Sequence, residues 1–600
     1  MNQRDDSSAR PLLLSCTIAI AITGSAMTAP TQKSPDVRLD DPTSLGASNA
    51  VQIAASGSSV YAIWSDGRND FFDVADIYFS RSTDRGATWS PDVRLDRDLP
   101  GAAESRQPQV AVAGSAVYVV WADSRNGAND IYFNRSLDGG VTWLAADVRL
   151  DTDAAGASLS TTPQIAARGS DVYVVWTDAR SSYGEIRFNR SVNQGGAWLS
   201  NDVQLDRGTV LATRPQIAAF SSAVYVTWED ARNGFDDIYF NRSLDNGATW
   251  LAFDVRLNTN TAGAAFSLAP QIASDGGSVF VTWQDARAGG LLTGDIYFNR
   301  SLDNGTTWLA ADVRLNTDLA GTAPSLSPQI AAAGSSVYVT WRDARAAQAD
   351  IYFNRSLDAG AAWLAADVRI DTDPGPGASL SPQIAASGSS VFVAWEDNRS
   401  GSPRLSDIYY SRSQDSGASW LTTDRRLNTG TPPNVVRALG PQIAFADDTA
   451  YVVWHDDRNG NEDAFFNIPF GMQNYGAGAA GSGGFTPTLR GSGQATIGQS
   501  INLDVADGLG GTSFTMLVGT QDVPGTPFQG GTLLVVPVLA VPFAMGGATG
   551  VAGDGALNIP LAIPNTPSSI GGALFFQAVL VDPGASQGIS MSPGLGLWIG

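Results

Sequence analysis

The chain has 600 residues, of which 43% are hydrophobic, 9% aromatic and 16% charged. This balance excludes a disordered chain, and the 64 glycines and 30 prolines favour turns and short strands, so we predict an all-β fold. The 37 basic and 59 acidic residues give a net charge of −22 without any basic stripe, which argues against nucleic acid as a partner. The single cysteine, Cys16, and the single histidine, His455, exclude a disulfide framework and a Cys/His zinc site.

The first 26 residues have the pattern of a secretory signal. Arg4 and Arg10 precede an apolar stretch over residues 11–22, and Gly24-Ser25-Ala26 supplies the small residues of a cleavage site. We therefore predict a signal peptide at 1–26 and a secreted or cell-surface protein, although a cytosolic start that begins with a strand stays open. No later stretch reaches the roughly 18 to 20 apolar residues of a membrane span, so no transmembrane segment is expected in the mature chain.

Residues 36–467 consist of repeated units. Each unit reads DVRL, a loop, PQIAA, VYVVW-x-D-x-R, a second loop, DIYFNRS and S-x-D-x-G-x-x-W. Its four short segments have the residue alternation of β-strands and are separated by Gly, Asp and Asn turns. A unit of four strands is the size of one propeller blade. The tryptophan of W-x-D-x-R marks eight units, at Trp64, Trp121, Trp176, Trp228, Trp283, Trp341, Trp395 and Trp454.

The two ends of the repeat region complement each other. Residues 36–39 form a DVRL segment that precedes any PQIAA segment, whereas the last unit, 441–467, has only three strand segments. If residues 36–39 supply the missing strand, every blade has four strands and no edge is left unpaired. We therefore predict an eight-bladed β-propeller closed by an N-terminal strand, rather than seven blades with leftover segments.

The S-x-D-x-G-x-x-W segment resembles the Asp-box, or BNR repeat, of sialidase-type propellers. The resemblance covers about two-thirds of the chain and implies a structural turn on the face away from the active site. Aspartate and serine side chains can bond the turn backbone, and tryptophan can bury a large apolar area, which agrees with that role. The copies are Asp84/Trp89, Asp138/Trp143, Asp245/Trp250, Asp303/Trp308, Asp358/Trp363 and Asp415/Trp420, and a seventh copy carries Asn193 in place of the aspartate before Trp198.

The W-x-D-x-R motif should lie on the opposite face. Arginine can bind a carboxylate through two hydrogen bonds, and sialidases, which this chain resembles, use clustered arginines for sialic acid. The loop after the motif is longer in units 1, 5 and 7, so Arg68, Arg287 and Arg399 are the candidates most able to separate from their aspartates and bind an acidic sugar, although a pattern repeated in all eight units favours a structural role. The alternative is that each arginine pairs with aspartate and only stabilises its blade.

No catalytic residue can be assigned from the sequence. The resemblance implies a tyrosine nucleophile supported by a glutamate, with an aspartate as acid/base. Here tyrosines such as Tyr78 and Tyr409 recur in the repeat, and Glu229 and Glu396 occupy a position that varies between units. His455 lies at the same variable position and is expected to be an ordinary surface residue.

Calcium is an open alternative for several loops, although no metal site is assigned. Closely spaced oxygen ligands suit calcium, but Asx-turns explain short Asp/Asn pairs without a metal. No other cofactor is expected. The pairs are Asp96/Asp98, Asp151/Asp153, Asn316/Asp318 and Asp371/Asp373.

The C-terminal part has a different composition. It is rich in glycine and poor in charge, and it contains six strand-like segments after a Gly/Ala run. We predict a linker at 476–484 and a β-sandwich at 485–600, which weakly resembles the glycine-rich C-terminal domains of secreted bacterial proteins.

The function predicted from these patterns is that of an exported scaffold, monomeric, which binds a carbohydrate or a surface protein. A sialidase-like exo-glycosidase is the alternative, and a structural surface protein is the third.

Overall fold

The computed structural model describes residues 36–599 except 71–73, 182, 291–292, 347, 373–374, 403, 447–448, 470, 493–494, 496–497 and 565–572. The predicted signal peptide at 1–26 lies outside the described residues. The described chain forms two compact units, and the boundary between them follows Pro469. Its regular elements are strands apart from one short 3-10 helix, η1 (Ser482–Gly484), which confirms the all-β prediction. No helix in this part of the chain is long and apolar enough to cross a membrane.

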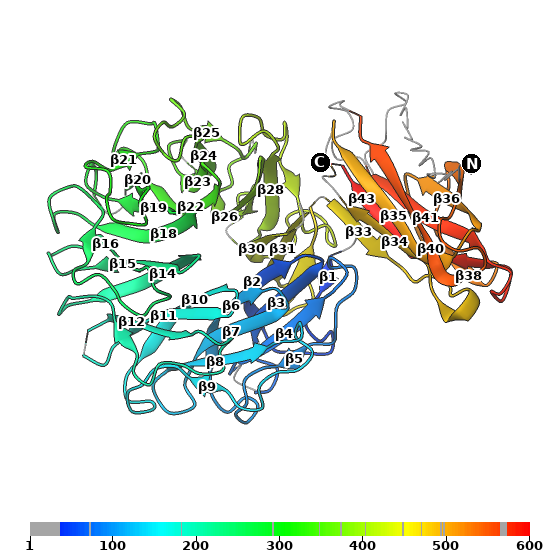
Figure 1. Cartoon of the computed structure of the whole chain (residues 1–600). Coiled ribbons are helices and arrows are strands. Elements are labelled where there is room, and N and C mark those ends of the chain that lie inside the picture. Colours follow the sequence, from blue (N-terminus) through cyan, green and yellow to red (C-terminus); the bar gives the residue numbers. More distant parts are fainter. Residues whose placement is uncertain are drawn as a thin grey trace, which may run out of the picture. The chain divides into compact units, whose positions relative to one another are not determined.

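The first unit contains eight four-stranded antiparallel sheets, numbered here 1 to 8 in chain order (Figure 1). The first strands are β2 (Ser48–Ser56), β6 (Ser105–Ala113), β10 (Ser160–Arg168), β14 (Ala212–Phe220), β18 (Ser267–Asp275), β22 (Ser325–Ala333), β26 (Ser379–Ser387) and β30 (Ala438–Ala446). The second strands are β3 (Ser59–Asp66), β7 (Ala116–Asp123), β11 (Asp171–Asp178), β15 (Ala223–Asp230), β19 (Ser278–Asp285), β23 (Ser336–Asp343), β27 (Ser390–Asp397) and β31 (Thr449–Asp456).

The outer half of each sheet is formed by a third strand of five to seven residues and a short fourth strand. The third strands are β4 (Asp76–Ser82), β8 (Asp130–Ser136), β12 (Glu185–Ser191), β16 (Asp237–Ser243), β20 (Asp295–Ser301), β24 (Asp350–Ser356), β28 (Asp407–Ser413) and β32 (Asp463–Asn467). The fourth strands are β5 (Val93–Arg94), β9 (Val148–Arg149), β13 (Val203–Gln204), β17 (Val255–Arg256), β21 (Val313–Arg314), β25 (Val368–Arg369), β29 (Arg425–Arg426) and, in sheet 8, β1 (Val37–Arg38).

Sheet 8 is therefore completed by the N-terminal strand. β1 pairs with β32 in the register Val37 to Phe466, and the Leu39 N–H donates to the Ala464 carbonyl oxygen at 2.8 Å. The predicted pairing of residues 36–39 with the last repeat strand is confirmed. Each first strand also contacts the first strand of the next sheet, and β30 contacts β2, so the series of sheets returns to its start.

Asp36 ties this N-terminal strand to sheet 8 by side-chain contacts. Its carboxylate lies 2.7 Å from the Arg458 guanidinium, accepts a hydrogen bond from the Gly430 N–H at 3.0 Å and accepts another from the Asn467 side chain at 2.8 Å.

We expect Asp36→Ala to lower the free energy of unfolding by about 2 kcal/mol, because it removes these bonds and leaves a buried arginine with one partner fewer. Urea denaturation followed by tryptophan fluorescence would measure the loss. A variant as stable as the wild type would show that these contacts do not hold the seam.

The core of this unit lies between successive sheets. In β15, Val224, Val226 and Trp228 pack against sheet 3, whereas Ala223 and Tyr225 pack against sheet 5. Because both faces of a second strand are buried, its sequence is a continuous apolar run instead of an alternating pattern. The tryptophan of W-x-D-x-R is fully buried in all eight sheets.

The Asp-box turns join the third and fourth strands and contact the preceding sheet. In sheet 4, Ser243 Oγ donates to Asp245 at 2.6 Å, and the N–H of Thr249 donates to the same carboxylate at 2.8 Å. Gly247 has a φ of +78°, and a Cβ there would lie 2.6 Å from the Phe188 ring of sheet 3. Edge-to-face contacts at 4.7–4.8 Å between ring centroids recur at Trp89–Phe466, Trp143–Phe79, Trp198–Phe133, Trp250–Phe188, Trp308–Phe240, Trp363–Phe298 and Trp420–Phe353.

Replacing Trp250 with alanine should lower the free energy of unfolding by about 2–3 kcal/mol. The change removes a large half-buried ring from between sheets 3 and 4, and the rigid strands cannot fill the space. Thermal and urea unfolding would measure the loss, with Phe253→Ala, an exposed aromatic close by in sequence, as the control. Equal losses for the two variants would contradict a packing role for Trp250.

The second unit contains a six-stranded, a three-stranded and a two-stranded sheet. Its strands are β33 (Gly471–Tyr475), β34 (Thr488–Ser492), β35 (Ser500–Leu509), β36 (Ser513–Gly519), β37 (Asp522–Phe528), β38 (Gly531–Val535), β39 (Leu539–Ala544), β40 (Ala552–Ala562), β41 (Ala573–Val581), β42 (Ile589–Met591) and β43 (Gly594–Trp598). One apolar core includes Leu503 of the three-stranded sheet and Met516 and Phe576 of the six-stranded sheet.

The segment expected to be a linker, residues 476–484, lies inside this second unit. β33 precedes the segment and pairs along its length with β43, and Ala479 forms a β-bridge with Met591. A Gly/Ala run has the composition of a flexible chain, but here small side chains allow the backbone to lie close to the sheet. A Cβ on Gly478 would lie 2.5 Å from the Met591 carbonyl oxygen.

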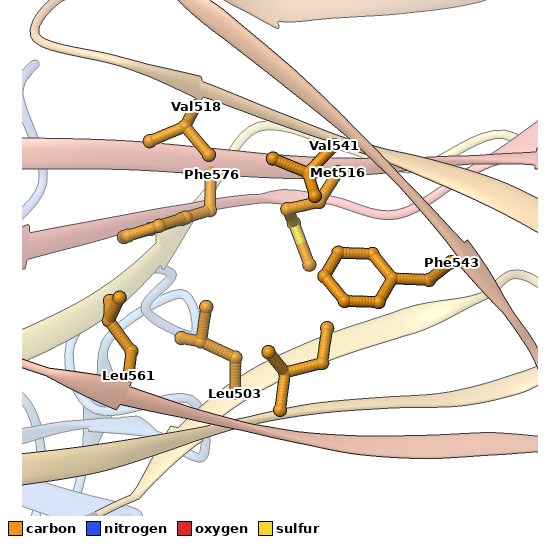
Figure 2. Close-up of a pocket in the computed structure, with 8 residues that line it drawn as sticks. Leu503, Met516, Val518, Val541, Phe543, Leu561 and Phe576 are labelled. Carbon is orange, nitrogen blue, oxygen red and sulfur yellow. The ribbon is translucent and has the colours of Figure 1, made fainter. Parts of the chain in front are cut away.

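A cavity between the sheets of the second unit is lined entirely by apolar side chains (Figure 2). It offers no hydrogen-bonding group, so it lacks the polar contacts that orient a specific ligand. The lining residues are Leu503, Met516, Val518, Val541, Phe543, Ile559, Leu561 and Phe576.

Candidate functional site

The W-x-D-x-R motifs lie where the second strand of each sheet ends. Sheet 2 illustrates their geometry: Trp121 Nε1 donates to Asp123 at 3.0 Å, and Arg125 Nε donates to the same carboxylate at 2.8 Å. The guanidinium also donates to Asp147, in the DVRL segment, at 2.8 Å and lies 4.0 Å from the centroid of the Tyr132 ring. One buried carboxylate thus fixes the tryptophan and the arginine, and a second carboxylate and an aromatic ring complete the arginine's surroundings.

The pairing with two aspartates recurs in all eight sheets, as the structural alternative for these arginines predicts. Each motif arginine contacts the aspartate two residues before it. The second partners, at 2.6–3.1 Å, are Arg68–Asp92, Arg125–Asp147, Arg180–Asp202, Arg232–Asp254, Arg287–Asp312, Arg345–Asp367, Arg399–Asp424 and Arg458–Asp36.

The longer loops do not separate Arg68, Arg287 or Arg399 from their aspartates. Arg287 lies 2.6 Å from Asp285 and 2.7 Å from Asp312. Arg68 and Arg399 each contact the two equivalent aspartates of their own sheets. Their side chains are only 12–20% exposed. The expected separation of these three arginines from their aspartates is therefore wrong, because the extra loop residues follow the arginine and leave its spacing from the aspartate unchanged.

The repeated tyrosines of the third strand are also engaged. A guanidinium covers the ring of Tyr78, Tyr132, Tyr239, Tyr297, Tyr352 and Tyr409 at 3.4–4.0 Å from the centroid. Asn69 Nδ2 donates to the Tyr78 hydroxyl at 2.7 Å. Burial raises the pKa of Tyr409 to about 12, which disfavours the phenolate that a nucleophile would need.

Two aspartate triads bring carboxylate oxygens within 4.8 Å of one another. They are Asp76/Asp96/Asp98 in sheet 1 and Asp130/Asp151/Asp153 in sheet 2. In sheet 1, Arg94 Nη1 lies 3.2 Å from Asp76, 3.2 Å from Asp96 and 3.3 Å from Asp98. In sheet 2, Arg149 contacts its three carboxylates at 2.7–3.0 Å. An arginine thus supplies the positive charge that calcium would bring, and we assign no metal to these triads.

Within each triad, two buried carboxylates face each other. Burial and the neighbouring Asp76 raise the pKa of Asp96 to about 9, and burial and Asp130 raise that of Asp151 to about 8. Sheets 4, 5 and 7 have asparagine at this position. Its amide donates to the aspartate that begins the third strand at 2.6 Å for Asn258, 2.7 Å for Asn316 and 2.8 Å for Asn428. A protonated Asp96 or Asp151 can make the equivalent hydrogen bond.

The residue between the tryptophan and aspartate of W-x-D differs between sheets and can bond the next sheet. Glu229 of sheet 4 accepts from the Ala269 N–H of sheet 5 at 2.6 Å, and Glu396 of sheet 7 accepts from the Gly440 N–H of sheet 8 at 2.9 Å. Arg214 also lies 3.2 Å from Glu229. Burial raises the pKa of both glutamates. Through these hydrogen bonds the two glutamates join neighbouring sheets.

His455, expected to be an ordinary surface residue, is only 13% exposed. Its Nε2 lies 4.0 Å from Glu462, and among the described residues its Nδ1 has no hydrogen-bond partner. Burial lowers the pKa of the imidazole, so the neutral form is favoured.

We call the end of the sheets that carries the loops between second and third strands the loop face. Three further side chains lie at this end in sheets 3 and 4, and none belongs to a repeated motif. Tyr183 and Phe235 occupy the same repeat position, two residues before the third strand, and Arg214 lies at a bulge in β14 with a φ of 52°. The signal for them is the departure from the repeat, since six other units carry different residues at the aromatic position.

No family model matches the sequence, and no curated protein matches it. Solved structures that match this chain include an ulvan lyase at 10% identity, covering 72% of this chain and 95% of that one, with a TM-score of 0.39. A mutant of the NanB sialidase from Streptococcus pneumoniae is 13% identical over 72% of this chain and 70% of its own, with a TM-score of 0.31. The β-propeller domain of the Trilobed protease from Pyrococcus furiosus is 8% identical over 65% and 99%, with a TM-score of 0.38. With TM-scores below 0.5, these similarities carry no argument about fold or function.

Proposed function

We propose that the chain is a binding scaffold for a glycan or protein ligand and does not hydrolyse glycosides. The architecture proposed for it is an eight-bladed β-propeller closed by the N-terminal strand, followed by a β-sandwich. The proposal places the protein outside the cell or on its surface, which rests on the order of charged, apolar and small residues in the first 26 positions.

The proposal that the chain does not hydrolyse glycosides rests on one observation. The groups that a sialidase mechanism would need are engaged in structural contacts: all eight motif arginines pair with two aspartates, and the six repeated tyrosines lie under those arginines. An arginine held in this way binds a second carboxylate only by giving up its own partners, which would leave a buried aspartate unpaired. A tyrosine with a raised pKa is a poor nucleophile.

The remaining variation on the loop face favours ligand binding. The eight sheets share one packing scheme, but the residues around the ends of the second strands change from sheet to sheet. A rigid framework with variable loops is the usual arrangement of a recognition surface.

The test uses the full chain with fluorogenic sialosides and a panel of other fluorogenic glycosides, in parallel with glycan and protein arrays. We expect no turnover and specific binding on one of the arrays. Turnover that Tyr409→Phe abolishes would overturn the proposal in favour of a sialidase-like glycosidase, and the absence of any bound glycan or protein would contradict the scaffold function.

A further inference from the structure

Two exposed aromatic side chains lie in the loops that join the second and third strands of sheets 3 and 4. Tyr183 is 55% exposed and Phe235 is 47% exposed, and both lie two residues before the third strand of their sheet. The same position carries Val74, Ala128, Thr293, Gln348, Leu405 and Asn461 in the other sheets. Only these two units present an aromatic ring there, so the repeat architecture does not require one.

Two more apolar side chains extend these rings across the boundaries between sheets. Leu211 is 46% exposed, and a Cβ on Gly184, next to Tyr183, would lie 2.9 Å from its Cδ1. The centroid of the Phe266 ring lies 4.4 Å from the centroid of the Phe235 ring. We call Tyr183, Leu211, Phe235 and Phe266 the aromatic ledge.

The backbone holds the ledge in place. The Ala212 N–H donates to the Gly184 carbonyl oxygen at 2.8 Å, between sheets 3 and 4. The Ser267 N–H donates to the Asp236 carbonyl oxygen, also at 2.8 Å, between sheets 4 and 5. These bonds anchor the residues next to all four ledge side chains, so binding would order little additional chain.

Polar side chains adjoin the ledge. The Arg214 guanidinium side chain is 60% exposed and lies 3.2 Å from Glu229. Asp236 follows Phe235 directly in the sequence and is half-buried. The charge of Arg214 is therefore offset by Glu229, which weakens its attraction for an anionic ligand. The same groups can donate to and accept from hydroxyls.

We propose that the aromatic ledge binds a neutral polysaccharide. Pyranose rings would place their C–H faces on Tyr183 and Phe235, because the negative face of an aromatic ring attracts polarised hydrogens. Arg214 and Asp236 would bond the hydroxyls. Four side chains are too few for a stable protein interface, which buries about 800 Å² on each partner. This inference rests on the proposed scaffold function and specifies its ligand class.

The experiment is affinity electrophoresis of the full chain in gels that contain one soluble polymer each. Xylan, galactomannan and a β-glucan represent neutral polymers, and polygalacturonate and alginate represent acidic ones. We expect retardation by at least one neutral polymer and no retardation by the acidic ones. Tyr183→Ala/Phe235→Ala should weaken that binding about tenfold or more, as the loss of two stacking contacts implies.

Phe253→Ala is the matched control, because Phe253 is an aromatic residue that is 82% exposed and lies beyond the Asp-box of sheet 4. It should bind as the wild type does. Circular dichroism would establish that the variants are folded, and Arg214→Gln, which leaves the rings in place, should also weaken binding.

The possible outcomes distinguish a wrong binding site from a wrong proposed function. Neutral-polymer binding that survives in the double variant would overturn the ledge as the site while leaving the scaffold function intact. Retardation by acidic polymers alone would overturn the ligand class. No retardation by any polymer, together with no binding on the arrays, would overturn the proposed function itself.

Discussion

We expect Asp230→Ala to lower the free energy of unfolding by about 3–5 kcal/mol. The Asp230 carboxylate is fully buried and accepts from Trp228 Nε1 at 3.2 Å, from the Arg232 N–H at 2.9 Å and from Arg232 Nε at 2.9 Å. Its removal leaves a buried indole N–H unpaired and an arginine with Asp254 as the remaining partner. Urea denaturation at neutral pH, followed by far-ultraviolet circular dichroism, measures the loss.

A double replacement distinguishes the destabilisation caused by leaving one charge unpaired from the contribution of the Asp230–Arg232 ion pair to the free energy of unfolding. Asp230→Leu/Arg232→Met removes both charges together, so it should recover a substantial part of the stability lost in Asp230→Ala. The exposed Asp-box residue Asp245 is the position control, and Asp245→Ala should cost less than Asp230→Ala because water can replace its bonds. A loss below about 1 kcal/mol for Asp230→Ala would contradict a structural role for the motif.

The fold could be predicted because the same pattern of strands and turns recurs in eight units of the sequence. A single apolar run such as that of β15 is ambiguous between a strand and a buried helix, but eight copies with turns at fixed places remove the ambiguity. The pairing of residues 36–39 with the last repeat strand followed from counting strands, since an unpaired edge is a liability that a repeat protein avoids, and the structure supplies its register, Val37 to Phe466.

The candidate site was harder to predict because loop length carries no information about side-chain partners. The spacing between Asp285 and Arg287 is the same as in units with short loops, and the insertion begins only after the arginine. Arg94 shows the same limit: sequence places it near acidic residues but does not show that its guanidinium contacts all three carboxylates. The meeting of Phe235 with Phe266 depends on the spacing between sheets, which no local pattern contains.

The acidic pairs of sheets 1 and 2 should make the protein less stable as the pH rises. The pKa of Asp96 is raised to about 9 and that of Asp151 to about 8, so protonation of these carboxylates stabilises the fold fully below the unfolded pKa of about 3.9. That stabilisation is lost as the pH rises from about 4 through these folded-state values. We expect Asp96→Asn/Asp151→Asn to be more stable than the wild type by about 2 kcal/mol per site at pH 9, and nearly equal to it at pH 4.

Melting temperatures of both proteins between pH 4 and pH 9 measure this difference, and sheet 4 supplies the reverse experiment. Asn258 Nδ2 donates to Asp237 at 2.6 Å, and Asn258 Oδ1 accepts from the Ile238 N–H at 2.9 Å, as Asp96 Oδ1 accepts from the Ile77 N–H at 3.0 Å. Asn258→Asp therefore places a second carboxyl in the same surroundings and should add a loss of stability at high pH. Parallel pH profiles for the wild type and both variants would show that these positions hold no proton, and that Arg94 and Arg149 alone balance the two triads.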